Sequence, residues 1–230
     1  MTNKDFRLRV RYGKMGRLRH LSHLEVVHAL ERSVRRAGLP FAVTQGFNPH
    51  MKIAFGPALP VGTAGEREYL DVWLTRYTAS EEALAALRQA SPEDLAPHEA
   101  RYIADGERSL TAALTIGEYH VEIDGKGIED TKVQAALRGV METGELVTER
   151  KGKQKVFDLT RCVPKDPRVS SREGGVDIDL AIRMGPEGSL RPEVLVRAAL
   201  SRTGIEPAAV RTTRTDTLVE GDEGIWSRPM

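Results

Sequence analysis

The chain of 230 residues has one cysteine, few aromatic residues and no long apolar run. The single cysteine, Cys162, excludes an internal disulfide framework and any multi-cysteine zinc or iron–sulfur site. No apolar segment approaches the roughly 20 residues that a membrane-spanning helix requires. The first residues, MTNKDFRLRVRYGK, lack the apolar core of a signal peptide. We therefore expect a cytoplasmic protein with no membrane association.

Several motifs that identify enzymes are also missing. The chain has no glycine-rich phosphate loop ending in Lys-Ser/Thr, no Gly-x-Gly-x-x-Gly that opens a helix and no Gly-x-Ser-x-Gly. His20, His23 and His28 are spaced almost like metal ligands, but His23 and His28 fall on different sides of the predicted helix. The sequence therefore predicts no metal site and no cofactor, and it identifies no catalytic residue.

Charge is distributed unevenly along the chain. Residues 1–60 contain eleven Lys/Arg and three Asp/Glu, a net charge of +8. The other 170 residues contain twenty-three Lys/Arg and thirty Asp/Glu, a net charge of −7. Such segregation favours an anionic partner for the first part, and nucleic acid is the commonest one. The alternative is that the two parts neutralise each other within one fold.

The first half of the chain has the pattern strand, helix, strand, strand, helix, strand. Alternation predicts a strand at 6–12 whose open face carries arginines, and a helix that starts after Ser22 with a capping box to Glu25. Extended segments at 41–43 and 51–55, a strand at 69–74, a helix at 80–89 and a strand at 100–104 follow.

The second half repeats the same order, with strands at 114–123, 155–163, 176–184 and 210–219 and helices at 130–141 and 192–202. We predict an α+β protein of two tandem ferredoxin-like (βαββαβ) units with antiparallel sheets. The predicted domains are 1–106 and 107–220, followed by a flexible tail at 221–230, and 163–175 is predicted to be a mobile loop. A single larger mixed sheet is the alternative.

Cationic side chains gather in the first quarter of the chain from the strand at 6–12, the turn after it and one side of the first helix. Phosphate groups are bound by such clusters, although a solvated helix face is the alternative. The predicted phosphate-binding residues are Arg7, Arg9, Arg11, Lys14, Arg17, Arg19, His20, Arg32, Arg35 and Arg36.

The stretch VTQGFNPHMKIAFG, residues 43–56, predicts a hairpin with functional side chains. Gly46 is expected to adopt the positive φ of a tight turn, and Asn48-Pro49 a second bend. His50 and Lys52 then project together beside Gln45 and Asn48, a combination that suits phosphate or carboxylate recognition. The alternative is a hairpin whose polar side only meets water.

Residues 9–74 closely resemble the bacterial radical-SAM-linked protein family. The matching motifs are RHLSHLE at 19–25, ERSVRRAGLP at 31–40, TQGFNPHMK at 44–52 and LPVGTAGEREYLD at 59–71. Members of the family are encoded beside, or fused to, a radical SAM protein with a B12-binding-type region. This chain lacks the three-cysteine cluster motif of such an enzyme. The resemblance implies a radical SAM protein as partner and nominates a surface: Arg19, Ser22, His23, Arg32, Arg36, Gln45, Asn48, His50, Lys52 and Glu68.

Three functions follow as hypotheses. The first is an accessory RNA-binding protein, for tRNA or rRNA, that works with a radical SAM enzyme in RNA modification or ribosome-linked processing. The second is a metal-independent endoribonuclease-like enzyme with His50 or His20 as acid/base and Lys52 stabilising charge. The third is a protein–protein adaptor whose basic face docks on the radical SAM partner.

Overall fold

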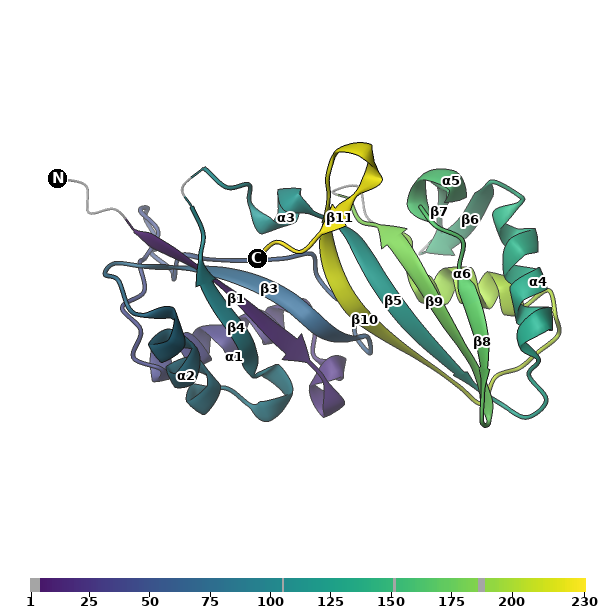
Figure 1. The fold of residues 1–230 in the computed structure, drawn as a ribbon, viewed down its shortest axis with the longest axis horizontal. Helices are drawn as coiled ribbons and strands as arrows, with labels where there is room; N and C mark the ends of the chain where they lie inside the picture. The colour runs from purple at the N-terminus through teal and green to yellow at the C-terminus, as the bar shows by residue number, and fades with distance from the viewer. Residues whose placement is uncertain (1–4, 105, 151, 186–188) are drawn as a thin grey trace. The chain divides into compact units, whose positions relative to one another are not determined.

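The computed structural model describes residues 5–104, 106–150, 152–185 and 189–230. It divides into two compact units, one formed by residues 1–114 together with 219–230 and the other by residues 115–218. Both units combine helices with a mostly antiparallel sheet, which confirms the predicted α+β class (Figure 1).

The sheet of the first unit runs in the order β4-β1-β3-β2, with antiparallel pairing throughout. Its elements are β1 (Phe6–Lys14), α1 (His23–Arg36), β2 (Ile53–Phe55), β3 (Ala64–Leu74), α2 (Ser80–Ala90) and β4 (Pro97–Tyr102). Short 3-10 helices at Gly16–His20 and Glu93–Leu95 complete the connections. The predicted order of strands and helices in this half is therefore confirmed.

The start and end of α1 follow from its sequence. The Ser22 hydroxyl accepts a hydrogen bond from the Glu25 amide (3.4 Å), and the Glu25 carboxylate accepts one from the Ser22 amide (2.8 Å). This is the predicted capping box. Gly38 follows the helix with a φ of 66°, a conformation that favours glycine. The apolar side of α1, with Leu30 and Val34 at its centre, packs against buried residues of β1 and β3.

The second face of this sheet is covered by α3 (Leu110–Ala113) and by the C-terminal segment. Tyr69 and Leu110 form a small core there, and Met230 packs against it. β11 (Trp226–Ser227) pairs with the last residues of β10, and the Pro229 carbonyl accepts a hydrogen bond from Arg9 (3.0 Å). The segment 221–230, predicted to be a flexible tail, thus contains β11 and contacts the first unit through the Pro229 carbonyl and the Met230 side chain.

The sheet of the second unit runs in the order β10-β5-β9-β8. The elements are β5 (Leu114–Asp124), α4 (Asp130–Met141), β6 (Glu145–Arg150), β7 (Lys153–Asp158), α5 (Leu159–Cys162), β8 (Arg168–Arg172), β9 (Gly175–Arg183), α6 (Pro192–Leu200) and β10 (Ala209–Glu220). β9 pairs antiparallel with β5 and β8, and β6 and β7 form a separate hairpin. Buried residues of α4 and α6, among them Leu137 and Leu195, pack on β5 and β9.

Two predictions for the second half are wrong. The strand expected at 155–163 divides into β7 and α5, because the Asp158 carboxylate accepts hydrogen bonds from the amides of Thr160 and Arg161 and so caps a helical turn. The segment 163–175, expected to be a mobile loop, contains β8. Its polar residues occupy an edge strand, where one side of the backbone faces away from the sheet.

The boundary between the units also differs from the predicted one. The second unit begins at Thr115, eight residues after the expected position 107. The reason is α3, whose Leu110 is buried against Tyr69 of the first unit.

Candidate functional site

The arginines of β1 do not form an open basic face. Arg9 is only 2% exposed, and the side chain of Asp71, on β3, is fully buried between Arg7 and Arg9. Arg7 Nη2 lies 2.6 Å from Asp71 Oδ2, and Arg9 Nε lies 2.7 Å from Asp71 Oδ1. Arg7 also donates to the carbonyls of Glu107 (2.8 Å) and Arg108 (2.9 Å). The donors of Arg7 and Arg9, which were predicted to bind phosphate, are therefore engaged by protein groups.

Other predicted cations also have protein partners. Arg11 pairs with Glu99 at 3.3 Å, and Arg19 donates to the Gly62 carbonyl at 2.9 Å. Arg35 lies 3.6 Å from Glu31, one turn earlier on α1, and its guanidinium stands over the Phe41 ring at 5.7 Å. These contacts reduce, but do not remove, their availability to a ligand.

Lys52 belongs to a small cluster around Trp73. Its Nζ lies 2.9 Å from the Asp5 carboxylate and 5.3 Å from the centre of the Trp73 ring. The Arg7 guanidinium lies over the same ring at 5.4 Å. Cations over an indole face are held by the ring's quadrupole, so Lys52 has a positioning partner as well as an ion pair.

Five cationic or titratable side chains within residues 5–60 are open to solvent. Within the described ranges, no ion pair or side-chain hydrogen bond engages them, and all five are exposed. We name this set the basic surface; it consists of Arg17, His20, His28, Arg32 and Arg36. Most of it comes from the outward side of α1, opposite the buried Leu30 and Val34.

The predicted hairpin is present at residues 43–51. Val43 and Met51 form a bridge, and the Thr44 amide donates to the His50 carbonyl at 2.8 Å. Thr44 Oγ1 lies 3.1 Å from His50 Nδ1, which is also 3.2 Å from the Asn48 carbonyl. Met51 is buried and anchors the base of the hairpin. Gly46 does not adopt a positive φ, so the turn is made without the left-handed glycine that we predicted.

Phe47, at the tip of this hairpin, is 100% exposed. Gln45, Asn48 and His50, on either side of it, are exposed as well. The polar residues of the hairpin were predicted as site residues, whereas Phe47 was not. An apolar residue between Gly46 and Asn48 was the available signal, since turn tips are normally polar.

A second cluster is buried between β1, α1 and β3. Lys14 is 2% exposed and Glu68 is 5% exposed, and with Tyr12 and His23 they line a cavity of about 10 Å³ under residues 56–59. A cavity of that volume holds about one water molecule. Lys14, which was predicted to bind phosphate on an open face, is therefore buried. Alternation along β1 already places Lys14 on the same face as the core residues Leu8 and Val10, a signal that the charge pattern outweighed.

His23 is half-buried at the edge of this cavity. Burial lowers its pKa below the ordinary value of 6.5; the positive charge of Lys14 lowers it further, whereas Glu68 opposes the shift. The His23 ring meets the Phe55 ring edge-to-face with centroids 5.9 Å apart. His23, which the family resemblance nominated for the surface, lies among aromatic and charged neighbours.

The second unit, residues 115–218, contains seventeen Lys/Arg and seventeen Asp/Glu, and it carries an ion-pair network on one face of its sheet. Arg211 lies 3.3 Å from Glu122, and Arg172 pairs with Asp124 and, at 2.7 Å, with Asp177. Hydrogen bonds from Arg211 lower the pKa of Glu122, and those from Arg172 and Arg211 lower that of Asp124. Arg172 and Arg211 thus pair with carboxylates of their own unit.

Neither a metal site nor a membrane-spanning helix is found in the part of the chain that the structure describes. No group of three or more His, Cys, Asp or Glu side chains is arranged to hold a metal ion there. No helix in those ranges is long and apolar enough to cross a membrane.

Comparisons with solved structures show a fold likeness at low sequence identity. A chain from a Cbf5-Nop10-Gar1 complex matches with a TM-score of 0.50 and 12% identity over 91% of this protein. This protein spans 48% of that chain, about half its length. An unknown protein from Galdieria sulphuraria (TM-score 0.28, 12% identity, covering 93% of this chain and 98% of that one) lies below the level at which a likeness is informative.

The sequence itself identifies a family. No functionally curated protein matches it. The model of the family described as "Uncharacterized protein conserved in bacteria (DUF2344)" matches residues 7–192, which contain the basic surface, the hairpin and the buried cluster. Because that match covers most of the chain, the protein belongs to this bacterial family.

Proposed function

We propose that the protein is a cytoplasmic RNA-binding accessory protein that works with a radical SAM enzyme in RNA modification or ribosome-linked processing. The observation that carries the RNA part is the fully exposed Phe47 at the tip of a hairpin, between the exposed Gln45 and Asn48. An aromatic ring in this setting can stack on an unpaired base, while amide side chains reach the base edges.

The basic surface provides the second element of such a site. The last turn of α1 lies beside the hairpin's base, since Arg35 stands over the ring of Phe41 two residues before Val43. Arg32 and Arg36 project from the same helix with exposed guanidinium groups. Phosphates bind such groups with a strong dependence on salt, whereas the stacking contact on Phe47 depends on salt much less.

The radical SAM partner is proposed from the family resemblance of residues 9–74.

The fold proposal is that the two units are tandem ferredoxin-like units. It is supported by the order β-α-β-β-α-β of the first unit and by sheet orders of the same type in both, β4-β1-β3-β2 and β10-β5-β9-β8. The hairpin β6–β7 and α5 would then be an insertion in the second unit.

Binding of tRNA and rRNA fragments across a salt series tests the RNA proposal. Replacing Arg32 and Arg36 by alanine is expected to weaken binding at least tenfold at low salt and to reduce the salt slope by about two phosphate contacts. Phe47→Ala is expected to weaken binding without changing that slope. Leu24→Ala, which removes another exposed apolar side chain (67% exposed), is the matched control. No binding by the wild type at low salt contradicts the proposal.

A protein–protein adaptor is the second candidate, because an exposed aromatic anchor also suits a protein pocket. Co-purification with the radical SAM protein after nuclease treatment, lost in Phe47→Ala, would favour it. The endoribonuclease-like alternative receives less support. Lys52, its proposed charge stabiliser, is paired with Asp5 at 2.9 Å, and His50 Nδ1 lies against Thr44 and the Asn48 carbonyl.

A further inference from the structure

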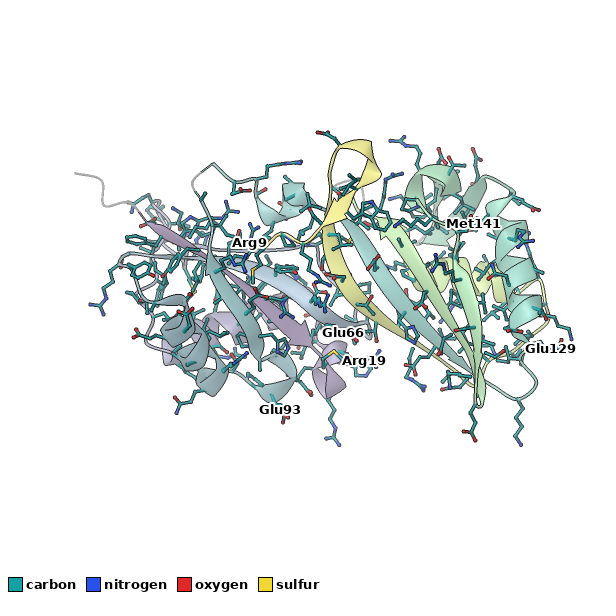
Figure 2. The ribbon with its side chains drawn as sticks, in the orientation of Figure 1. Arg9, Arg19, Glu66, Glu93, Glu129 and Met141 are labelled. Atoms are coloured by element: carbon teal, nitrogen blue, oxygen red, sulfur yellow. The ribbon has the colours of Figure 1, made fainter. Side chains whose placement is uncertain are left out.

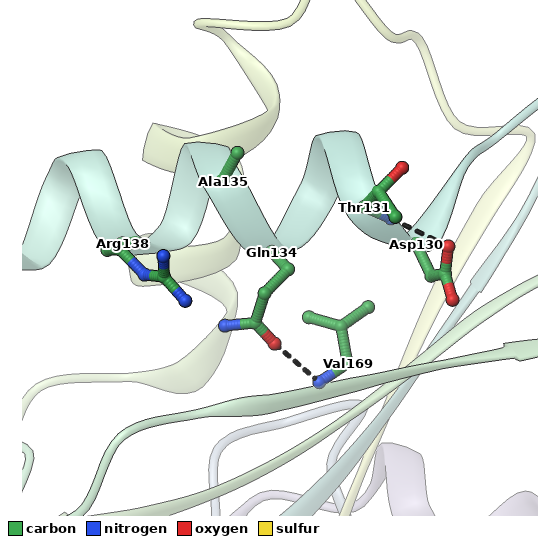
Figure 3. A pocket seen from close by; sticks show the side chains of 6 residues that line it. All are labelled: Asp130, Thr131, Gln134, Ala135, Arg138 and Val169. Carbon is green, nitrogen blue, oxygen red and sulfur yellow. Dashed lines mark hydrogen bonds between the residues drawn. The ribbon is translucent and has the colours of Figure 1, made fainter.

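A groove of about 310 Å³ lies between α4 and β8 in the second unit, far along the chain from the basic surface and the hairpin. Its lining residues are Asp130, Thr131, Gln134, Ala135, Arg138 and Val169 (Figure 3). β8 is the edge strand of the β10-β5-β9-β8 sheet. The groove therefore has a helix on one side and the edge of a sheet on the other.

The register of β8 determines which of its backbone groups point into the groove. Arg172 pairs with Gly175 across a two-residue turn, Ser171 with Val176 and Val169 with Ile178. In an antiparallel ladder, hydrogen-bonded and non-hydrogen-bonded pairs alternate, starting with the bonded pair beside the turn. Val169 and Ser171 therefore direct their N–H and C=O groups away from β9.

Gln134 on α4 already uses part of this edge. Its Oε1 accepts a hydrogen bond from the Val169 amide at 3.0 Å, and its Nε2 donates to the Pro167 carbonyl at 3.2 Å (Figure 3). One side-chain amide thus supplies both the donor and the acceptor that a neighbouring strand would present. The Val169 carbonyl and both backbone groups of Ser171, an exposed residue, continue the same edge.

The charges along the groove indicate what kind of strand fits. Asp130 and Arg138 lie eight residues apart on α4, about 12 Å at 1.5 Å per residue. Four extended residues span about 13 Å. The Arg138 side chain is exposed and, in the described ranges, has no hydrogen bond or ion pair. Between the two charges, Ala135 and Val169 present small apolar surfaces.

We propose that this groove binds an extended peptide segment of about four residues, which adds to the edge of β8 as a further strand. The peptide displaces the Gln134 side-chain amide and places its C-terminal carboxylate on Arg138. Backbone hydrogen bonds hold a peptide in this mode, and the side chains that face the groove decide its specificity. The site is independent of RNA binding.

The test uses the full chain and a synthetic peptide of alternating threonine and valine with a free C-terminal carboxylate, compared with its C-terminal amide. Titration at millimolar concentration is expected to shift the NMR signals of the Val169 and Ser171 amides to saturation. Ser171→Pro removes the outward N–H without touching the ladder to β9 and is expected to weaken binding at least tenfold, while Ser171→Ala preserves it.

Two further variants keep the test decisive if Ser171→Pro does not fold. Gln134→Ala removes the competing amide and is expected to tighten binding severalfold. Arg138→Ala is expected to abolish the preference for the carboxylate over the amide form, whereas Lys132→Ala, on the same helix but outside the groove, is not. The proposal is overturned if no β8 amide shifts, or if Gln134→Ala and Arg138→Ala bind both peptides as the wild type does.

Discussion

At the scale of single residues, Asp71 is the most constrained charge in the first unit. It is fully buried and shared by Arg7 and Arg9, so Asp71→Ala leaves two cations in a desolvated site (Figure 2 labels Arg9). Removing one partner of a buried pair typically costs about 3–5 kcal/mol. We expect a loss of that size in the free energy of unfolding, measured in urea.

The matched control is Glu99→Ala, which removes a carboxylate from the same sheet, where Glu99 pairs with Arg11 and Arg101 at a half-exposed position. Surface pairs contribute about 0–1 kcal/mol. Equal losses in the two variants would contradict the assignment of Arg7 and Arg9 to the core of the fold rather than to a ligand.

His23 makes a prediction about pH. Its folded pKa is lowered, mainly by burial, so the folded state binds fewer protons than the unfolded state below pH 6.5. His23 therefore does not change the free energy of unfolding above that pH. It lowers this free energy progressively as the pH falls through 6.5 towards the folded pKa. An NMR titration of the His23 ring is expected to give a midpoint below 6.5, and Lys14→Met is expected to raise it. A midpoint at or above 6.5 in the wild type would refute the placement of His23 beside the cavity.

At the scale of elements, the capping box determines where α1 begins. Ser22→Ala removes the hydroxyl that accepts from the Glu25 amide, and cap losses cost about 0.5–2 kcal/mol. Ser80→Ala is the comparison, because α2 begins at Ser80 with Ala79 as its N-cap and without a side-chain cap bond. We expect urea unfolding to show the loss for Ser22 only. If Ser80→Ala loses a similar amount of stability, the loss in Ser22→Ala does not come from the cap.

At the scale of the whole molecule, residues 219–230 belong to the same unit as β1, although the two lie far apart in sequence. Deleting residues 226–230 removes β11, the carbonyl that Arg9 uses and the Met230 side chain beside Tyr69. We expect the free energy of unfolding to fall by about 1–3 kcal/mol, roughly the effect of uncovering one large apolar side chain. Ile225→Ala, at a position 66% exposed, is expected to change nothing measurable. If the deletion variant has the same free energy of unfolding as the wild type, the result supports the predicted flexible tail.

Local patterns determined much of this fold. Alternation located β1, β5 and β9, the capping box located α1, and the helical period located α4 with its observed bounds. These features depend on neighbours within a few residues, so the sequence alone can show them. The hairpin at 43–51 was predictable for the same reason.

Tertiary structure decided which charges are available. In the sequence, Arg7, Arg9 and Lys14 look like an exposed cationic strand. In the structure, Arg7 and Arg9 pair with Asp71, more than 50 residues away along the chain, and Lys14 lines a cavity beside Glu68. The peptide groove likewise depends on Gln134 meeting Val169 from a different element. The sequence by itself determined where strands and helices form, because their causes are local. Only the packed chain decided which side chains face solvent, because burial and ion pairing join residues that are distant in sequence.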